Sequence, residues 1–267
     1  MSNTHHKGTA VITGASTGIG AVYADRLARR GHDLILVARN RDRLNELAKR
    51  LTTQTGRFVE VVIADLTNSA DLHRVEQILR TDASIATLVN NAGIGSATPL
   101  VDSNVDAMES MIDLNVTALT RLTYSVAPKL AERGQGTIIN ISSIVAVAPE
   151  ILNGVYGATK AYVLAFSQSL HHELGSKGIR VHAVLPGAIS TPFWNVAGYP
   201  VDNLPPENVM DVNDLVDAAL AGLDAGELAT VPSLPDIVQW DAYQAARAGF
   251  TLEKLSRAKP AARYGVN

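Results

Sequence analysis

The chain has 267 residues, of which 46% are hydrophobic and 18% charged, and its formal net charge is −3. This composition excludes an unfolded chain and predicts a compact globular protein. The absence of any basic stripe argues against a nucleic-acid partner, and the absence of cysteine excludes disulfides and thiolate metal sites, so no metal is expected. Residues 1–7 do not form a secretory signal and no stretch reaches the roughly eighteen apolar residues of a membrane span, so we expect a cytoplasmic protein.

Apolar runs and helical stripes alternate along the chain. Short apolar runs predict strands at residues 9–13, 34–38, 58–64, 85–90, 137–142 and 179–185. Periodicity near 3.6 residues predicts helices at 19–30, 41–52, 72–79, 105–130 and 155–174. This alternation predicts an α/β fold of the Rossmann type: a doubly wound parallel sheet in three layers, with helices on both faces.

The alternation of predicted strands and helices ends at residues 186–206, which contain five prolines and the aromatics Phe193, Trp194 and Tyr199. We interpret this segment as a substrate flap, because long irregular segments are often functional, although its aromatics could equally serve as packing anchors. Residues 145–153 and the region around Trp240 are further candidates for shaping a pocket. Nothing marks a second domain, so we predict one domain over 1–267 with a C-terminal extension at 233–267.

A glycine-rich turn follows the first predicted strand. It reads T-G-x-x-x-G-I-G over residues 13–20, and its cofactor-binding candidates are Gly14, Ser16, Thr17, Gly18 and Ile19. Glycines allow close approach of a phosphate to the backbone, and the N-terminus of the next helix attracts an anion. The alternative is a tight turn that binds nothing.

The same turn matches a second motif. Residues 14–18 read G-x-S-x-G, the nucleophile elbow of α/β-hydrolases, which would make Ser16 a nucleophile. Against this reading, Ser16 follows the first strand rather than a later one, and His182 lies inside a predicted strand. A serine hydrolase is therefore the rival enzyme class.

The residues after the second and third strands bear on the choice of cofactor. An acidic residue after the second strand would hold a free ribose 2′-hydroxyl, whereas Arg39 suits a 2′-phosphate and favours NADP(H) over NAD(H). Asp65 and Leu66 are candidates for adenine contacts. The alternatives are a solvated arginine and an ordinary helix-start aspartate.

Tyr156 and Lys160 are four residues apart at the start of a predicted helix, so their side chains share one face. A lysine ammonium nearby is expected to lower the pKa of the phenol and make a general acid/base. Ser143, after the fifth strand, is positioned to hold a substrate carbonyl oxygen, with Ser142 as the alternative. Each of these residues could instead be an ordinary surface or turn residue.

Two asparagine motifs complete the set of candidates. Asn115 interrupts the apolar stripe of the helix predicted at 105–130, where a polar side chain must find hydrogen bonds. Asn91, Ala92 and Gly93 follow the fourth strand, where small residues let the backbone pass close to a ribose or nicotinamide.

Together these motifs resemble the classical short-chain dehydrogenase/reductase family, NADP-type, over about residues 8–192. The resemblance rests on the glycine turn, N-N-A-G at 90–93, the set Asn115, Ser143, Tyr156 and Lys160, and P-G at 186–187. It implies a carbonyl or secondary-alcohol oxidoreductase that uses NADP(H). Tyr156 would be the general acid/base, Lys160 would hold the ribose hydroxyls, Ser143 would position the carbonyl oxygen and Asn115 would hold a relay water.

The resemblance also implies contacts from the flap and an assembly. Pro186, Gly187, Ile189 and Thr191 would cover the carboxamide side of the nicotinamide, and Tyr156 and Lys160 would also contact the cofactor. Thr17 departs from the many NADP-type members that have a basic residue there. Members are usually homodimers or homotetramers, packed through the helices that carry Asn115 and Tyr156. A catalytically idle NADP(H)-binding protein is the rival from another functional class.

Overall fold

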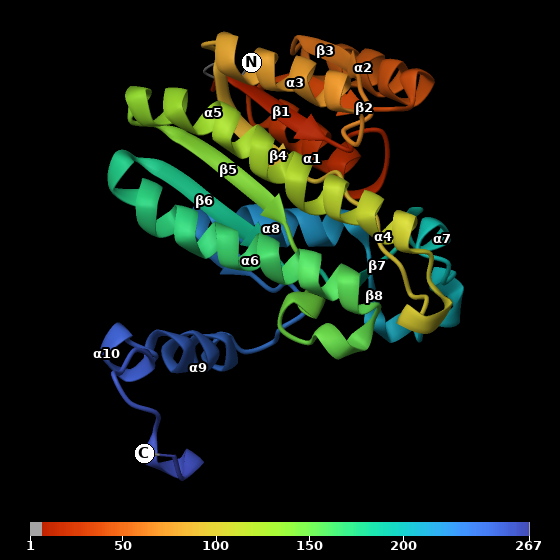
Figure 1. Cartoon of the computed structure of the whole chain (residues 1–267). Coiled ribbons are helices and arrows are strands. Elements are labelled where there is room, and N and C mark those ends of the chain that lie inside the picture. Colours follow the sequence, from red (N-terminus) through yellow and green to blue (C-terminus); the bar gives the residue numbers. More distant parts are fainter. Residues whose placement is uncertain (1–6, 267) are drawn as a thin grey trace. The chain divides into compact units, whose positions relative to one another are not determined.

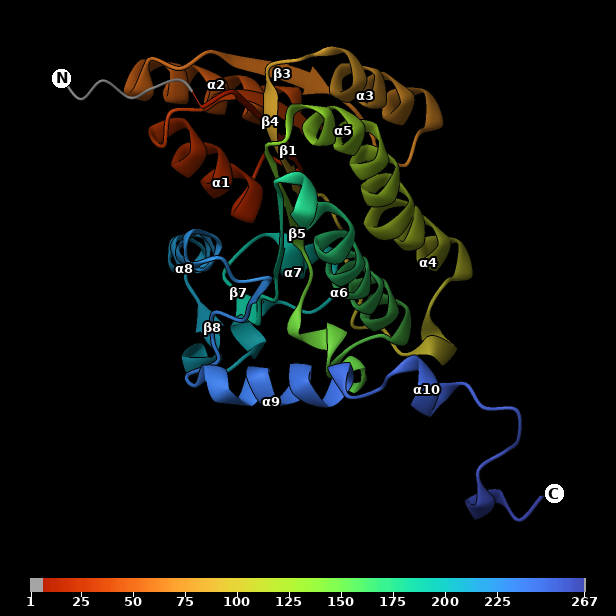
Figure 2. The same ribbon diagram turned by 90° about the vertical axis from the view of Figure 1, so that its left-hand side faces the viewer.

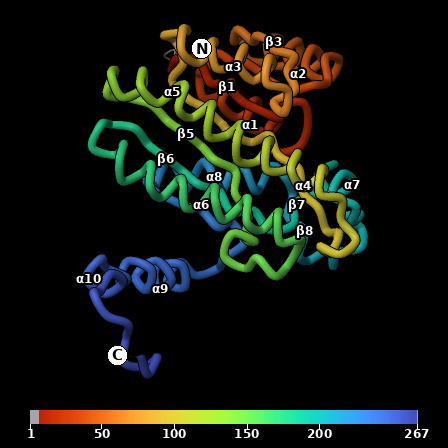
Figure 3. Tube along the Cα trace, viewed as in Figure 1, coloured from red at the N-terminus to blue at the C-terminus, as the bar shows by residue number. Residues whose placement is uncertain are grey.

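The larger of the two units into which the chain divides, Met1–Pro232 and Ser233–Asn267, is built on a parallel sheet. The computed structural model describes residues 7–266, and within this range the sheet has seven strands in the order β3-β2-β1-β4-β5-β6-β9. Their bounds are β1 Thr9–Thr13, β2 Asp33–Ala38, β3 Val59–Ile63, β4 Ile85–Asn90, β5 Gly136–Ile141, β6 Ile179–Val184 and β9 Ala229–Thr230. The chain proceeds outward from β1 through β2 to β3 and then returns to β4 beside β1, which makes β1 and β4 the switch point of the topology. Figure 3 gives the path of the Cα trace, coloured along the sequence.

Helices cover both faces of this sheet. One core cluster joins the sheet to α1 (Gly18–Arg29), α2 (Arg41–Thr55) and α8 (Val212–Ala225). The other joins it to α3 (Ser69–Thr81), α5 (Leu119–Arg133) and α6 (Gly154–Leu174). Figures 1 and 2 show the two helical layers with the strands between them. The predicted three-layer, doubly wound α/β fold is confirmed.

The predicted strands match the structure closely. All six predicted strands are present with bounds within one residue. The helix predicted at 41–52 extends to Thr55 and ends at Gly56, whose φ of 69° is the left-handed conformation that glycine adopts readily. The prediction omitted α8 and β9, and β9 is only two residues long, too short to show any periodicity.

The prediction of one continuous α-helix over residues 105–130 is wrong. The structure has α4 (Val105–Ile112), then six π-helical residues, η2 (Asp113–Ala118), and then α5. A π-helical stretch rotates the residues that follow it relative to an α-helical stripe. Ile112, the last residue before the π-helical stretch, is 44% exposed, whereas Asn115 within that stretch is buried.

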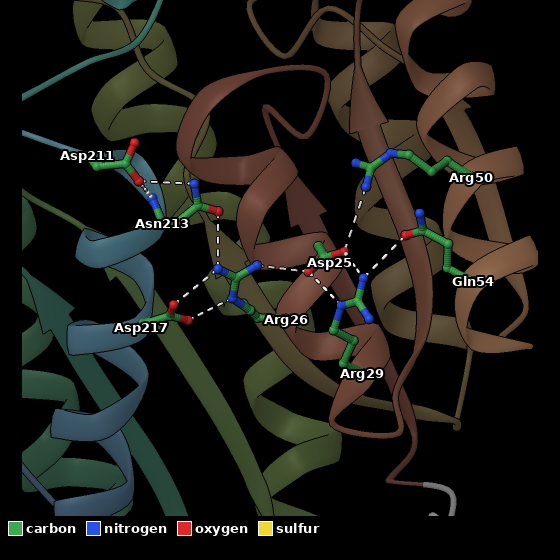
Figure 4. A network of polar contacts seen from close by, with 8 residues as sticks. All are labelled: Asp25, Arg26, Arg29, Arg50, Gln54, Asp211, Asn213 and Asp217. Carbon is green, nitrogen blue, oxygen red and sulfur yellow. Dashed lines mark hydrogen bonds and ion pairs between the residues drawn. The ribbon is translucent and has the colours of Figure 1, made fainter.

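An ion-pair network ties α1 to α8 and α2 (Figure 4). Arg26 of α1 donates to Asp217 of α8 at 2.7 Å and to Asp25 at 2.9 Å, and Arg29 also donates to Asp25 at 2.9 Å. Burial by itself would raise the pKa of Asp25, but the hydrogen bonds from Arg29 and Arg26 outweigh it and lower this pKa. The buried carboxylate therefore stays charged, and it also pairs with Arg50 of α2 at 3.7 Å.

The segment predicted as a flap is anchored at several points. It contains β7 (Ala188–Ile189), paired with β8 (Val209–Met210), and the short helix α7 (Phe193–Val196). Trp194 Nε1 donates to the Ile189 carbonyl at 2.9 Å, and the Ala97 amide donates to the Ala197 carbonyl at 3.0 Å. The remaining short helical turns of this unit are η1 Leu100–Asp102, η3 Ile144–Ala146, η4 Pro149–Ile151, η5 Gly175–Lys177, η6 Val201–Asn203 and η7 Pro206–Asn208.

The second unit contains α9 (Ile237–Ala248), α10 (Leu252–Leu255) and η8 (Ala262–Tyr264). Trp240 and Tyr243 lie on α9 with ring centroids 5.4 Å apart. Among residues 7–266, no helix has the length and apolar character needed to cross a bilayer.

Candidate active site

The carboxyl ends of six strands, β1 to β6, open onto one cavity of about 970 Å³. The first residues after β1, β2 and β4, namely Gly14, Arg39 and Asn91, line it, as do Ser143 and Pro186, two residues after β5 and β6. The other predicted residues that line it are Ser16, Thr17, Gly18, Ile19, Asp65, Leu66, Ala92, Gly93, Tyr156, Lys160, Gly187, Ile189 and Thr191. Asn115 alone among the predicted site residues does not line this cavity.

The glycine turn packs so closely against neighbouring backbone that it has no room for side chains at Gly14 and Gly20. Gly14 has a φ of 65°, and a Cβ placed on it would lie 2.9 Å from the Cα of Ala92. A Cβ on Gly20 would lie 2.5 Å from the Gly14 carbonyl oxygen. Thr17 precedes α1 without capping it through its side chain, so the first amides of the helix keep their capacity to bind an anion. These residues fit the pyrophosphate of a dinucleotide.

Arg43 lines the cavity together with Arg39, after β2, and the sequence did not identify it as a candidate. Arg39 is 74% exposed, with Nη1 3.8 Å from Asp65 Oδ2, and Arg43 lines the same wall. Arg43 is fixed in the first turn of α2, where its amide donates to the side chain of the N-cap Asn40 at 3.0 Å. A second basic residue one turn into the helix after β2 was the available signal. Two guanidinium groups therefore lie on the same side of the cavity, after β2.

The start of α6 is held by an asparagine that the sequence analysis also overlooked. Asn153 Oδ1 accepts hydrogen bonds from the amides of Val155 at 2.8 Å and Tyr156 at 3.4 Å. Its Nδ2 donates to the carbonyl of Thr98 at 2.6 Å. An asparagine just before a helical stripe is a recognisable N-cap signal. Asn153 therefore fixes the backbone of Tyr156 relative to the segment after β4.

Tyr156 is 6% exposed and its hydroxyl is protonated at neutral pH. Burial raises its pKa to about 12, and a hydrogen bond with Ser143 opposes this rise. The sequence predicts that Lys160 lowers the pKa of the phenol, whereas the net shift of this pKa in the structure is upward. Desolvation of the phenolate outweighs the other effects, because the ring lies in a closely packed apolar cluster.

The two serines after β5 have different partners. The Ser142 hydroxyl donates to the Lys160 backbone carbonyl at 2.8 Å, and this hydrogen bond joins the end of β5 to α6. Ser143 Oγ accepts from the Val145 amide at 3.3 Å and donates to the Pro186 carbonyl at 3.4 Å, both long bonds. Ser143 thus caps a turn and also retains the freedom to contact Tyr156 and a ligand.

Lys160 lies one helical turn after Tyr156, as its spacing predicts. Its Nζ is 5.8 Å from the centre of the Tyr156 ring and donates to the Ile141 carbonyl at 2.9 Å. Burial lowers the pKa of this lysine to about 8. The site therefore contains a buried cation and a buried phenol whose pKa values are both displaced by desolvation.

We expect Lys160→Met to raise the free energy of unfolding at pH 7. The folded-state pKa of about 8 lies below the ordinary value of 10.5, so the unfolded chain binds more protons between these two pH values. Burying the charge therefore destabilises the fold by up to about 3 kcal/mol below pH 8, and this cost disappears as the pH rises to 10.5. Urea unfolding of both proteins from pH 7 to 10.5 measures the difference, which should shrink with pH. The exposed Lys177→Met is the control, and a difference independent of pH would contradict this account.

Asn115 holds backbone rather than facing the cavity. Its Nδ2 donates to the Ile94 carbonyl at 2.8 Å and to Thr159 Oγ1 at 3.1 Å, and its Oδ1 accepts from the Ile94 amide at 3.0 Å. Thr159 in turn donates to the Tyr156 carbonyl at 2.8 Å. The side-chain amide thus joins the segment after β4 to α6.

The end of the cavity near Tyr156 is apolar. It is lined by Ile94, Ala97, Leu114, Ile144, Val145, Ile151, Leu152, Phe193, Trp194, Val196, Tyr199 and Leu204. The charged lining residues are Arg39, Arg43, Asp65 and Lys160, and the first three follow β2 and β3. Both segments expected to shape a pocket, 145–153 and the flap, contribute to this wall, whereas Trp240 belongs to the second unit.

The hydrolase alternative lacks its histidine. His182 is fully buried in β6, where Nε2 bonds to Thr230 Oγ1 of β9 at 2.9 Å, and it does not line the cavity. Burial lowers its pKa to about 4, so it stays neutral. Ser16 therefore lies beside glycines and a helix N-terminus without this general base.

Comparisons with known proteins agree with this geometry. The family model described as short chain dehydrogenase matches residues 8–198. A short-chain dehydrogenase from Sphingobium yanoikuyae, solved in complex with NADPH, is 50% identical with a TM-score of 0.92, covering 96% of this chain and 100% of that one. The bulky-bulky ketone specific alcohol dehydrogenase from Comamonas testosteroni is 47% identical with a TM-score of 0.88, covering 96% and 98%. An uncharacterized oxidoreductase of Staphylococcus epidermidis is 37% identical over 185 residues, 69% of this chain and 79% of the relative.

Proposed function

Because this chain belongs to the short-chain dehydrogenase family of oxidoreductases, we propose that it uses NADPH to reduce an uncharged, apolar ketone, with Tyr156 as the proton donor. The observation that carries the proposal is the position of the Tyr156 hydroxyl. It is buried and protonated in a cavity with a glycine-lined phosphate cradle at one end and an apolar wall at the other. A donor that keeps its proton at neutral pH suits reduction better than oxidation.

The cofactor assignment rests on residues of this chain and on one relative. The glycine turn fits a pyrophosphate, and Arg39 with Arg43 fits a 2′-phosphate. The Sphingobium yanoikuyae relative is a complex with NADPH, and it is half identical to this chain. When bound, NADP(H) supplies or accepts the hydride.

Each catalytic side chain has a separate task in this proposal. Ser143 donates a hydrogen bond to the carbonyl oxygen, and Tyr156 transfers its phenol proton to that oxygen as negative charge develops. The Lys160 cation stabilises the phenolate that remains and is placed to hold ribose hydroxyls. Asn115 keeps Ile94 and α6 in register, and its predicted relay water remains a proposal.

The substrate assignment follows from the lining of the cavity. Its apolar wall would leave a carboxylate or phosphate of the substrate without a partner, which would cost several kcal/mol. A sugar would lose hydrogen bonds there for the same reason. The Comamonas testosteroni relative is specific for ketones with two bulky substituents, which agrees with a wide apolar cavity.

Purified protein should oxidise NADPH in the presence of aryl alkyl ketones, measured as loss of NADPH absorbance, and should ignore acyl-CoA and sugar ketones. The rival, an idle NADP(H)-binding protein, predicts NADPH binding in calorimetry without turnover of any ketone. Binding without turnover across aryl, dialkyl and cyclic ketones would contradict the proposed activity.

We propose that the chain forms a homo-oligomer through α5 and α6. Tyr124 of α5 is 68% exposed, and its ring stacks on Phe166 of α6, which also stacks on Tyr162. Exposed aromatic clusters of this kind are typical of protein interfaces. Tyr124→Glu is expected to shift the sedimentation coefficient to that of a monomer. The equally exposed Phe58→Glu, just before β3, should leave the assembly intact, and an unchanged Tyr124→Glu assembly would exclude this interface.

A further inference from the structure

One aromatic ring of the cavity wall lies between the proton donor and a glycine. The Phe193 and Tyr156 ring centroids are 5.9 Å apart with planes tilted by 43°. On another side, a Cβ placed on Gly95 would lie 2.4 Å from Cζ of Phe193 and 3.1 Å from Cε2. The ring therefore occupies the space that any side chain at position 95 would take. Phe193 also lines the cavity itself, so part of its surface faces a ligand.

The surroundings leave the ring little freedom except toward the cavity. Trp194 packs edge-on against it, with centroids 5.7 Å apart and planes at 86°, and the indole is fixed by its bond to the Ile189 carbonyl. The Ala97–Ala197 hydrogen bond ties its short helix to the segment that carries Gly95. Tyr156, Gly95 and Trp194 thus bound the ring on three sides.

The segment that carries Gly95 is itself fixed at both ends. Asn115 holds Ile94 through two hydrogen bonds. Asn153 holds the other end, because its backbone amide donates to the Ser96 carbonyl at 3.4 Å and its side chain donates to the Thr98 carbonyl. A group added at position 95 cannot be accommodated by moving this backbone without breaking those bonds. The ring must move instead, because it is the free end of a side chain.

We propose that Phe193 and Gly95 act as a pair that sets the size of the ketone substituent accepted beside Tyr156. The bare Gly95 lets the Phe193 ring lie back against the wall, which leaves room for a bulky substituent next to the phenol. This inference rests on the proposed function and adds its specificity determinant. A side chain at position 95 would push the ring into the cavity and restrict the site to small substituents.

Gly95→Ala is a clean test of this pair because it does not strain the backbone. Gly95 is absent from the glycines with positive φ, so alanine can adopt its conformation. Gly175→Ala is the matched control, since nothing lies within 4 Å of a Cβ placed there. The readout is kcat/KM with NADPH for phenyl alkyl ketones whose alkyl chain lengthens from methyl to pentyl.

We expect Gly95→Ala to lower kcat/KM for the pentyl ketone at least about tenfold more than for the methyl ketone, as a steric cost of about 1–3 kcal/mol implies. Phe193→Ala should shift the ratio toward the pentyl ketone. In the Phe193→Ala background, adding Gly95→Ala should change the ratio less than about twofold, because the methyl group then meets no ring. A crystal structure of Gly95→Ala should show the ring displaced into the cavity.

The outcomes separate this inference from the proposed function. Equal losses for all ketones in Gly95→Ala, or a shift of the ratio that persists without the Phe193 ring, would overturn the inference while the reductase activity stands. An undisplaced ring in the Gly95→Ala crystal would overturn it as well. A wild-type protein that binds NADPH and reduces none of the ketones would instead overturn the proposed function and the inference with it.

Discussion

Tyr156→Phe is expected to lower kcat/KM for ketone reduction by about 10²- to 10⁴-fold, the usual contribution of a positioned general acid. The ring that packs against Phe193 and the apolar cluster is retained, so the fold and the cavity should keep their shape. The hydroxyl is the only group lost, and with it the proton that the carbonyl oxygen receives. Steady-state kinetics with NADPH and an aryl alkyl ketone measure the loss, and calorimetry should find NADPH affinity nearly unchanged.

Tyr162→Phe is the matched control for this prediction. Tyr162 lies on the same helix, is 38% exposed and bonds to Thr120 outside the cavity. Its loss should leave kcat/KM within about twofold, as for most surface substitutions. Activity that survives Tyr156→Phe at the wild-type level would show that another group delivers the proton.

Arg39→Asp is expected to reverse the choice between the two nicotinamide cofactors. The arginine provides charge-assisted hydrogen bonds to a 2′-phosphate, whereas an aspartate repels it and accepts a bond from a free 2′-hydroxyl. Asp65 lies 3.8 Å from Arg39, so the substitution would leave two carboxylates facing the phosphate. A loss of about 3 kcal/mol corresponds to roughly a 100-fold rise in the KM for NADPH, while the KM for NADH should fall.

Arg43→Ala separates the contributions of the two arginines. Arg43 lines the same wall and is expected to give a smaller loss of NADPH affinity, about tenfold, as for one charge-assisted bond. Arg41→Asp is the control, because Arg41 is exposed and does not line the cavity. An unchanged cofactor preference in Arg39→Asp, with a large loss in Arg43→Ala, would assign the phosphate to Arg43 instead.

The parts of the site that could be predicted from the sequence follow strands. Gly14, Arg39, Asn91 and Ser143 come just after buried apolar runs, and parallel strands bring such positions to one edge of the sheet. The helical spacing of Tyr156 and Lys160 likewise places both residues without knowledge of the tertiary structure. Local pattern was sufficient for these residues because backbone geometry dictates where each one lies.

The remainder depends on packing between distant segments. The π-helical turn around Asn115 has no signature in the hydrophobic pattern, and the partners of that side chain come from Ile94 and Thr159. The direction of the Tyr156 pKa shift depends on how completely the ring is buried, which spacing alone does not reveal. The contact of Phe193 with Gly95 joins residues nearly a hundred positions apart. No single window of sequence contains these relations.

Asn153 links the start of α6 to the segment that follows β4. The same side-chain amide that caps α6 at Val155 and Tyr156 also donates to the Thr98 carbonyl in the segment after β4. Thr98 and the first turn of α6 share one side chain as hydrogen-bond partner, so the segment after β4 and the backbone of Tyr156 are held in one fixed relation.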